Sequence, residues 1–377
     1  MKWTDDLLDR KRLLMDPLAD QVVAEIVDRN GEEAAFRVFD LLIRNIEMPI
    51  EDLPDEVDTF VNETDRLPAW ADWQQIETSE ELFLDHGPKF LLFLYYKSLP
   101  QLYTDAKGAE VLVRTGRLSH KEGDHRIFTR RIAETGQFMM DVMARDGLKP
   151  GSEGIRSIQK VRLIHAAIRR FLKNRGWDRE RLGEPINQED LALTLMSFSV
   201  SPLEGLGQFG IHEDPQKMEA YMHTWRAVGS LLGVDEDLLP NSLAEGQSLM
   251  EKILDRQSAP SEAGRLLAKA LVEFARETLP SERLDDAPVY LIRKLIGRKR
   301  ADMLNVHVEY GCLGITVPLI VRKWFTMGER LEDRIDGPLR VLVDRLSEET
   351  VRAMVGYFDQ TKKRKFTIPP EMYKRWF

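Results

Sequence analysis

Apolar residues recur with the three-to-four-residue period of an α-helix through nearly the whole 377-residue chain. Residues 16–29 and 33–47 are predicted amphipathic helices, the first with Asp16 as its N-cap and Pro17 at its first position. The same period predicts helices over 262–278 and 287–299. Alternating β-branched strands joined by hairpin turns are not found. The sequence therefore predicts an all-α fold built as a helical bundle.

Two consecutive segments, residues 130–146 and 159–177, carry polar side chains within otherwise apolar helical stripes. The stripe of the second segment consists of Val161, Ile164, His165, Ile168 and Leu172. The stripe of the first consists of Arg131, Thr135, Phe138, Met139 and Val142. Glycines and a proline between the segments predict a turn, which would make the two helices neighbours in a hairpin. An arginine, a threonine and a histidine are thus predicted to point towards an apolar interior.

Burial of these three polar groups is unfavourable unless each finds a partner, by roughly 1 to 3 kcal/mol for a neutral group and more for a charge. For His165 two interpretations stay open: a hydrogen-bonded core histidine, or a metal ligand, since apolar surroundings favour the neutral imidazole with its free lone pair. Arg169 and Arg170 follow it and are suited to anionic groups at a pocket edge. For Arg131 and Thr135, ordinary packing and helix hydrogen bonding are the alternative.

Acidic side chains outnumber basic ones, 63 to 54, for a formal net charge of −9, which argues against general affinity for nucleic acid or anionic lipid. The single cysteine, Cys312, excludes an intrachain disulfide framework, a cysteine-held iron–sulfur cluster, a multi-cysteine zinc site and C-x-x-C-H haem attachment. Apolar runs fall short of the roughly 20 residues of a membrane span, and no secretory signal is found. We expect a cytoplasmic protein without a transmembrane span, and peripheral membrane contact stays open.

The pattern of helices and breaks divides the chain into three predicted parts. Residues 1–78 are an N-terminal helical extension, which ends in an exposed connection rich in Pro, Asp and Glu. The core covers 79–300 and begins at Ser79, a candidate N-cap, with Pro88 and Pro100 bracketing a buried helix. Residues 301–377 are a C-terminal helical segment packed on the core, whose last residues, RKFTIPPEMYKRWF, are predicted to be an extended tail docked by its aromatics.

Five motifs follow one another between roughly residues 80 and 300. They are VRTGRL at 113–118, R-x-x-x-T-G at 131–136, V-R-L-I-H-A-A-I-R at 161–169, G-x-P-I-N-Q-E-D-L at 183–191 and W-x-x-x-G-x-L-L-G at 225–233. In this order they resemble the MpaB-type oxygenase family, which includes the rubber-cleaving latex clearing proteins. Five motifs in a fixed order are more specific than any one of them.

The resemblance implies a helical fold with a globin-like core that holds non-covalent haem b, with His165 as the proximal ligand of the iron. It implies that Arg131 and Thr135 lie near the distal face or the haem edge, and that Arg169 helps to bind the cofactor. The implied function is a haem-dependent oxygenase that uses dioxygen on an apolar, alkene-containing substrate, of a hydrophobic small-molecule or lipid-like kind, with cleavage of the C=C bond as one outcome.

One position departs from the family pattern. Latex clearing proteins carry a lysine just before the motif threonine, whereas this chain has Glu134, a candidate weak sixth ligand, general base or solvated surface group. The glutamate proposed as a base in those proteins has no clear match, because the corresponding stretch reads Arg114 and Thr115. The distal chemistry of the family is therefore not carried over as a whole.

Four other interpretations follow from these departures and from the residues. A haem-binding sensor or storage protein would keep the cofactor without turnover, and a haem-free helical interaction protein would need no interior Arg131 or Thr135. A di-iron carboxylate enzyme needs two Glu-x-x-His elements, of which only Glu122 to His125 is found. Thiolate-ligated haem would require Cys312, whose surroundings lack the signature of that class.

Overall fold

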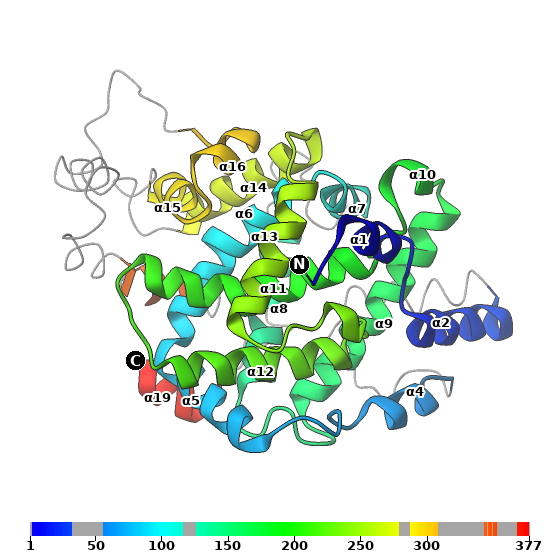
Figure 1. Ribbon diagram of the computed structural model, residues 1–377, viewed down its shortest axis with the longest axis horizontal. Coiled ribbons are helices and arrows are strands. Elements are labelled where there is room, and N and C mark those ends of the chain that lie inside the picture. Colours follow the sequence, from blue (N-terminus) through cyan, green and yellow to red (C-terminus); the bar gives the residue numbers. More distant parts are fainter. Residues whose placement is uncertain are drawn as a thin grey trace. The chain divides into compact units, whose positions relative to one another are not determined.

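The computed structural model describes residues 2–31, 56–115, 126–278, 287–307, 343–344, 346–348, 350–352 and 368–376. Within these ranges the secondary structure is helical, apart from one isolated bridge between Asp105 and Ser258 (Figure 1). The predicted all-α fold is confirmed for the described part of the chain. The predicted helix 33–47, the Glu122 to His125 element and Cys312 lie outside the described residues.

The chain folds into two compact units, one of residues 1–81, 134–196 and 215–253, the other of residues 82–133, 197–214 and 254–377. Four helices contribute residues to both: α5 (Trp73–Phe93), α8 (Arg126–Met143), α11 (Gln188–Gln208) and α13 (Leu243–Gln257). The predicted boundaries at residues 78 and 300 stay predictions.

The first unit is organised around α9 (Glu153–Asn174). Its other helices are α1 (Asp5–Lys11), α2 (Pro17–Asn30), α4 (Glu56–Thr64), α10 (Arg179–Leu182), α12 (Pro215–Leu231) and the 3₁₀ turn η3 (Glu236–Leu238). Helices α2 and α12 both pack against α9, and α2 also packs against α4 (Figure 1). Asp16 caps α2 by accepting from the Ala19 amide, and Pro17 opens the helix, as predicted.

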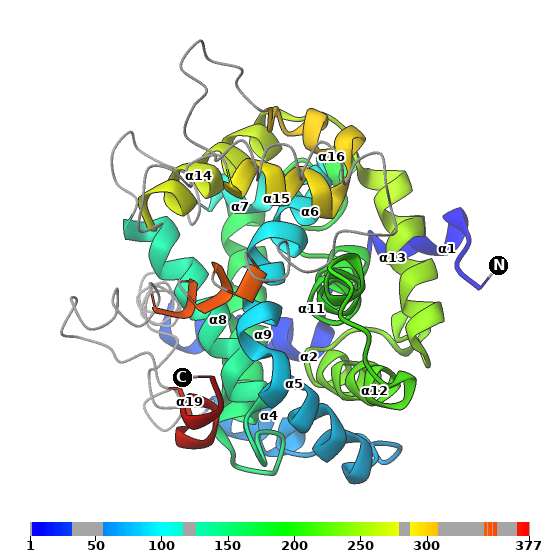
Figure 2. The same cartoon turned by 90° about the vertical axis from the view of Figure 1, so that its left-hand side faces the viewer.

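The second unit contains the π-helical turn η2 (Leu94–Ser98), α6 (Leu99–Thr104), α7 (Gly108–Arg114), α14 (Glu262–Thr278), α15 (Ala287–Ile296), α16 (Arg298–Met303) and α19 (Pro370–Trp376). Helix α14 packs against α6, α7 and α15 (Figure 2). The predicted helix 262–278 is confirmed. The predicted helix 287–299 is interrupted at Gly297, whose φ of 79° lies in the left-handed region, so that α16 starts as a separate helix.

Three predictions were wrong: the N-cap at Ser79, Pro88 as a boundary of a buried helix, and the extended conformation of the C-terminal tail. Ser79 is not an N-cap, because α5 starts at Trp73 and continues through Pro88 to Phe93. Pro88 lacks an N–H and leaves the carbonyl of Leu84, four residues earlier, without its helical donor. The Trp376 indole N–H donates to this carbonyl at 2.8 Å. Trp376 therefore docks as predicted, but it belongs to the helix α19 and not to an extended tail.

Candidate functional site

Helices α8 and α9 form the predicted hairpin. The Ser157 hydroxyl on α9 donates to the carboxylate of Asp141 on α8 at 2.7 Å. Gly154 in the first turn of α9 allows this approach, since a Cβ there would overlap the carbonyl oxygen of Gly147 and lie 2.7 Å from that of Asp141. The two chain segments that carry the predicted site residues are therefore packed directly on each other near the turn.

Two carboxylates hold the turn between α8 and α9. Glu80 accepts a hydrogen bond from the Asp146 amide at 3.1 Å, and Asp65 accepts from the Gly151 amide at 2.7 Å. Asp146 has a φ of 60°, a conformation that few residues other than glycine adopt readily. Burial raises the pKa of Glu80 to about 7. These contacts fix where α9 begins relative to the end of α8.

His165 lies on the one strip of α9 that is partly exposed in the middle of the helix. Val161, one turn earlier, is also partly exposed, whereas Ile164, Ala166 and Ala167 are at most 3% exposed. Residues four apart share a helix face, so the Val161–His165 strip is less tightly covered by protein than the faces on either side. The predicted apolar stripe is present, and its histidine borders a less densely filled part of that surface.

Arg131 and Thr135 lie one turn apart on α8 and are also partly exposed. Ile132 and Ala133 between them are nearly inaccessible, at 2% and 1%. The prediction placed both polar side chains in the apolar interior, whereas the structure places them at its margin. This position costs less desolvation than full burial would.

Glu134 is buried, at 5% exposure, which excludes a solvated helix residue. It precedes Asp141 by seven residues, two helical turns, so the two carboxylates share a face of α8, whereas Glu134 and Thr135 are offset by about 100° around the axis. Burial raises the pKa of Asp141 to about 6, although Ser157 and Gln137 both donate to it. Glu134 is therefore a buried carboxylate on α8, three residues after Arg131 and directly before Thr135.

Arg169 is 1% exposed and is held by protein groups. Its Nε donates to the Asp20 carboxylate at 2.6 Å, and its Nη1 donates to the Ile186 carbonyl at 3.4 Å. Burial raises the pKa of Asp20, and the positive charge of Arg169 opposes this rise. The remaining nitrogen, Nη2, is buried and has no hydrogen-bond partner within the described residues.

Residues in and next to the last motif, 225–233, make contacts that stabilise the fold. Trp225 on α12 is buried with its ring 6.5 Å from that of Phe138 and 6.2 Å from that of Tyr221. His223 Nε2 accepts from the Asp72 amide at 2.9 Å, and burial lowers the pKa of this histidine. The neutral ring that this acceptor role requires fits a structural histidine.

In the part of the chain that the structure describes, no three His, Cys, Asp or Glu side chains form a group able to hold a metal ion. A porphyrin supplies four nitrogen donors itself and needs one axial imidazole from the protein. His165 on its apolar strip fits that requirement, and the buried Nη2 of Arg169 fits a carboxylate acceptor. None of the described helices is long and apolar enough to cross a membrane.

Within the described ranges these features define a helical protein with a candidate haem-ligating histidine, His165, on α9. The family described as "ER-bound oxygenase mpaB/B'/Rubber oxygenase, catalytic domain" matches residues 88–316, more than half of the chain. The chain belongs to this family, as its motifs predicted. All five motifs lie within the matched residues.

Two relatives describe the similarity further. The chain is 24% identical over 265 residues to a protein named "Rubber oxygenase" from Streptomyces sp. (strain K30), an alignment that covers 70% of this chain and 63% of the relative's length. It is similar in fold to the latex clearing protein LCP in its closed state, with a TM-score of 0.69 at 23% identity over 91% of each chain. The helical architecture is therefore shared with a solved member of the group.

Proposed function

We propose that this protein is a haem b-dependent oxygenase that uses dioxygen to oxidise an apolar, alkene-containing substrate. The observation that carries the proposal is His165, a single imidazole on the partly exposed strip of an otherwise buried helix, at the ligand position of its family's motif. Family membership and the helical fold support the same function.

The proposed roles of the side chains follow from their chemistry. His165 would supply the imidazole nitrogen that holds the haem iron, and the buried residues on either side of it limit the movement of α9. Arg131 and Thr135 are hydrogen-bond donors at the margin of the apolar region, suited to a propionate or to developing negative charge on oxygen. Arg169 Nη2 is a donor for a propionate. Bound haem supplies the redox chemistry towards dioxygen.

Glu134 takes a different role from the lysine of the latex clearing proteins. Its carboxylate is buried on α8, three residues after Arg131 and directly before Thr135. We propose that a carboxylate at this position gives the distal side of this protein a charge opposite to that of the lysine in the latex clearing proteins.

Haem loading tests the proposal first. The protein is produced with haem supplementation, and the Soret band is recorded for wild type, His165→Ala and the exposed-histidine control His212→Ala. We expect the band in wild type and in the control, and a large loss in His165→Ala that added imidazole partly restores. Absence of a Soret band from the wild type, or equal bands in all three proteins, refutes haem ligation by His165.

Oxygen consumption tests turnover. The reduced, haem-loaded protein is screened against unsaturated lipids and prenylated aromatics, and the products are identified by mass spectrometry. We expect consumption with at least one alkene-bearing class and a product enriched with label from ¹⁸O₂. Binding of dioxygen or carbon monoxide without consumption in any class would indicate the sensor or storage function instead.

A further inference from the structure

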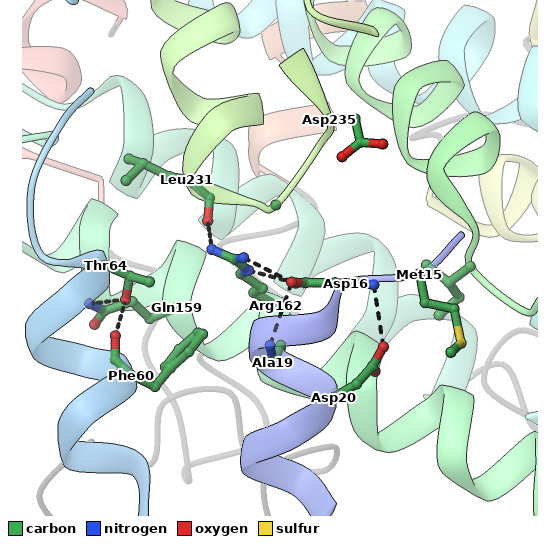
Figure 3. A network of polar contacts seen from close by, with 12 residues as sticks. Met15, Asp16, Ala19, Asp20, Phe60, Thr64, Gln159, Arg162, Leu231 and Asp235 are labelled. Carbon is green, nitrogen blue, oxygen red and sulfur yellow. Dashed lines mark hydrogen bonds and ion pairs between the residues drawn. The ribbon is translucent and has the colours of Figure 1, made fainter. Parts of the chain in front are cut away.

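One buried and one partly buried ion pair connect the start of α2 to α9 on both sides of His165. Arg162 Nε and Nη2 donate to the two carboxylate oxygens of Asp16 at 2.6 and 2.8 Å, and its Nη1 donates to the Leu231 carbonyl at 3.0 Å (Figure 3). One turn further along α2, Asp20 accepts from Arg169 at 2.6 Å. The side chains of Arg162, Asp16 and Arg169 are at most 10% exposed.

The surrounding chain is built closely around the first of these pairs. A Cβ at Gly233 would lie 2.7 Å from the Asp16 carboxylate and 2.8 Å from the Arg162 guanidinium. Gln188 donates to the carbonyls of Met15 and Gly233 at 2.8 and 2.9 Å and so ties the residue before Asp16 to the end of α12. The ion pair therefore has little freedom to shift.

Helical geometry brings both pairs next to the candidate ligand. His165 follows Arg162 by three residues and precedes Arg169 by four, and residues with these spacings are neighbours on a helix surface. Two anchors about two turns apart fix both the rotation of α9 about its axis and its position along that axis. The rotation of α9 and its position along the axis both determine the direction in which the His165 imidazole points.

We propose that Asp16 and Asp20 are positioning residues that hold α9 so that His165 is presented as an axial ligand, and that their negative charges offset two guanidinium charges beside that ligand. The proposal rests on the proposed haem function. It assigns to the start of α2 a role that acts through α9, without contact with the cofactor.

The charge part of the proposal has a direct consequence. Replacement of Asp20 by asparagine leaves the guanidinium of Arg169 without its counter-charge, one turn from His165. An added positive charge near the iron favours the reduced state, because it interacts less favourably with iron(III) than with iron(II). We therefore expect the midpoint potential to shift to a more positive value, corresponding to a roughly tenfold change in the iron(II)/iron(III) ratio, about 59 mV for one electron.

The experiment compares haem-loaded wild type, Asp20→Asn, Asp16→Asn, the conservative rescue Asp20→Glu, and Asp28→Asn as a control. Asp28 is exposed on the same helix and carries the same charge. The readouts are the midpoint potential from spectroelectrochemistry and the iron–histidine stretching band of the reduced protein from resonance Raman. We expect both to change in Asp20→Asn and Asp16→Asn, to recover largely in Asp20→Glu, and to stay at wild-type values in Asp28→Asn.

Unchanged potential and stretching band in folded Asp20→Asn and Asp16→Asn overturn the proposal, and so do equal shifts in Asp28→Asn. Circular dichroism establishes that each variant is folded. A second readout uses the haem-free protein: the ring resonances of ¹³C-labelled His165 are expected to shift in Asp16→Asn while those of exposed His212 do not. If wild type binds no haem, the proposed function fails, and this measurement still decides whether the ion pairs orient His165.

Discussion

The pair of Asp16 and Arg162 should contribute strongly to the stability of the first unit. Two hydrogen bonds of 2.6 and 2.8 Å join side chains that are 3% and 10% exposed, so removal of either partner leaves a charge stranded in a poorly solvated place. Such a loss costs about 3 to 5 kcal/mol. Arg162→Met keeps much of the side-chain volume, and Asp16→Asn keeps a good N-cap for α2, so the capping contribution largely cancels.

A double-mutant cycle isolates the interaction. Wild type, both single variants and the double variant are compared by hydrogen exchange and mass spectrometry on peptides that cover α2 and α9, which reports the opening free energy of this region. We expect each single variant to lose about 3 kcal/mol and the double variant to lose little more, for a coupling of about 2 to 3 kcal/mol.

A small coupling energy in the double-mutant cycle would contradict this expectation. Exposed ion pairs give couplings of about 0.2 to 1 kcal/mol. A coupling in that range would mean that solvent reaches the Asp16–Arg162 pair, and it would remove the basis for rigid placement of α9. Asp28→Asn combined with Arg162→Met is the matched control, and additive effects are expected there because Asp28 is exposed elsewhere on α2.

Three further predictions concern other parts of the chain. Gly154→Ala should destabilise the α8–α9 hairpin by about 1 to 3 kcal/mol because the new methyl group meets backbone oxygens, whereas Gly207→Ala, with open space around its Cβ position, should be neutral or stabilising in urea unfolding. The raised pKa of Asp141, about 6 in the fold against an ordinary 3.8, means that the folded protein binds more protons than the unfolded chain between about pH 4 and 6. The free energy of unfolding should therefore fall by up to about 3 kcal/mol as the pH rises through this window, and Asp141→Asn should flatten the profile; a rise in wild type would contradict the assignment. Trp376→Ala leaves the Leu84 carbonyl without its donor, so the C-terminal helix should become the first site cut in limited proteolysis, and an unchanged pattern would show that its docking does not depend on this bond.

Local sequence signals correctly predicted the helices whose ends depend on residues within about one turn. Asp16 and Pro17 define the start of α2 because the cap and the proline act within one turn. The α14 boundaries follow from an uninterrupted apolar period. The prediction for α5 failed because a proline usually ends a helix, whereas Pro88 is tolerated through a donor on Trp376, 292 residues away from the carbonyl it serves. A local pattern carries no information about such a distant partner.

The candidate site shows the same difference between features that depend on local residues and features that depend on distant parts of the chain. The periodicity groups His165 with apolar residues of α9, whereas the partial exposure of His165, Arg131 and Thr135 depends on how neighbouring parts of the chain cover them. The sequence leaves open whether Glu134 is buried or in solvent, and the structure buries it at 5% exposure, because this burial depends on how neighbouring parts of the chain cover α8.

The ligand motif itself contains the two arginines that the structure pairs with α2. In V-R-L-I-H-A-A-I-R the arginines stand three residues before and four after the histidine, about 10.5 Å apart along the axis at 1.5 Å per residue. Asp16 and Asp20 are only about 6 Å apart by the same measure, and the long arginine side chains span the difference. The sequence suggests anion binding for Arg169, yet its nearest acid comes from a segment 149 residues earlier. On the proposed function, a histidine between two such anchors would be held in place before the cofactor binds, which would lower the conformational cost of binding.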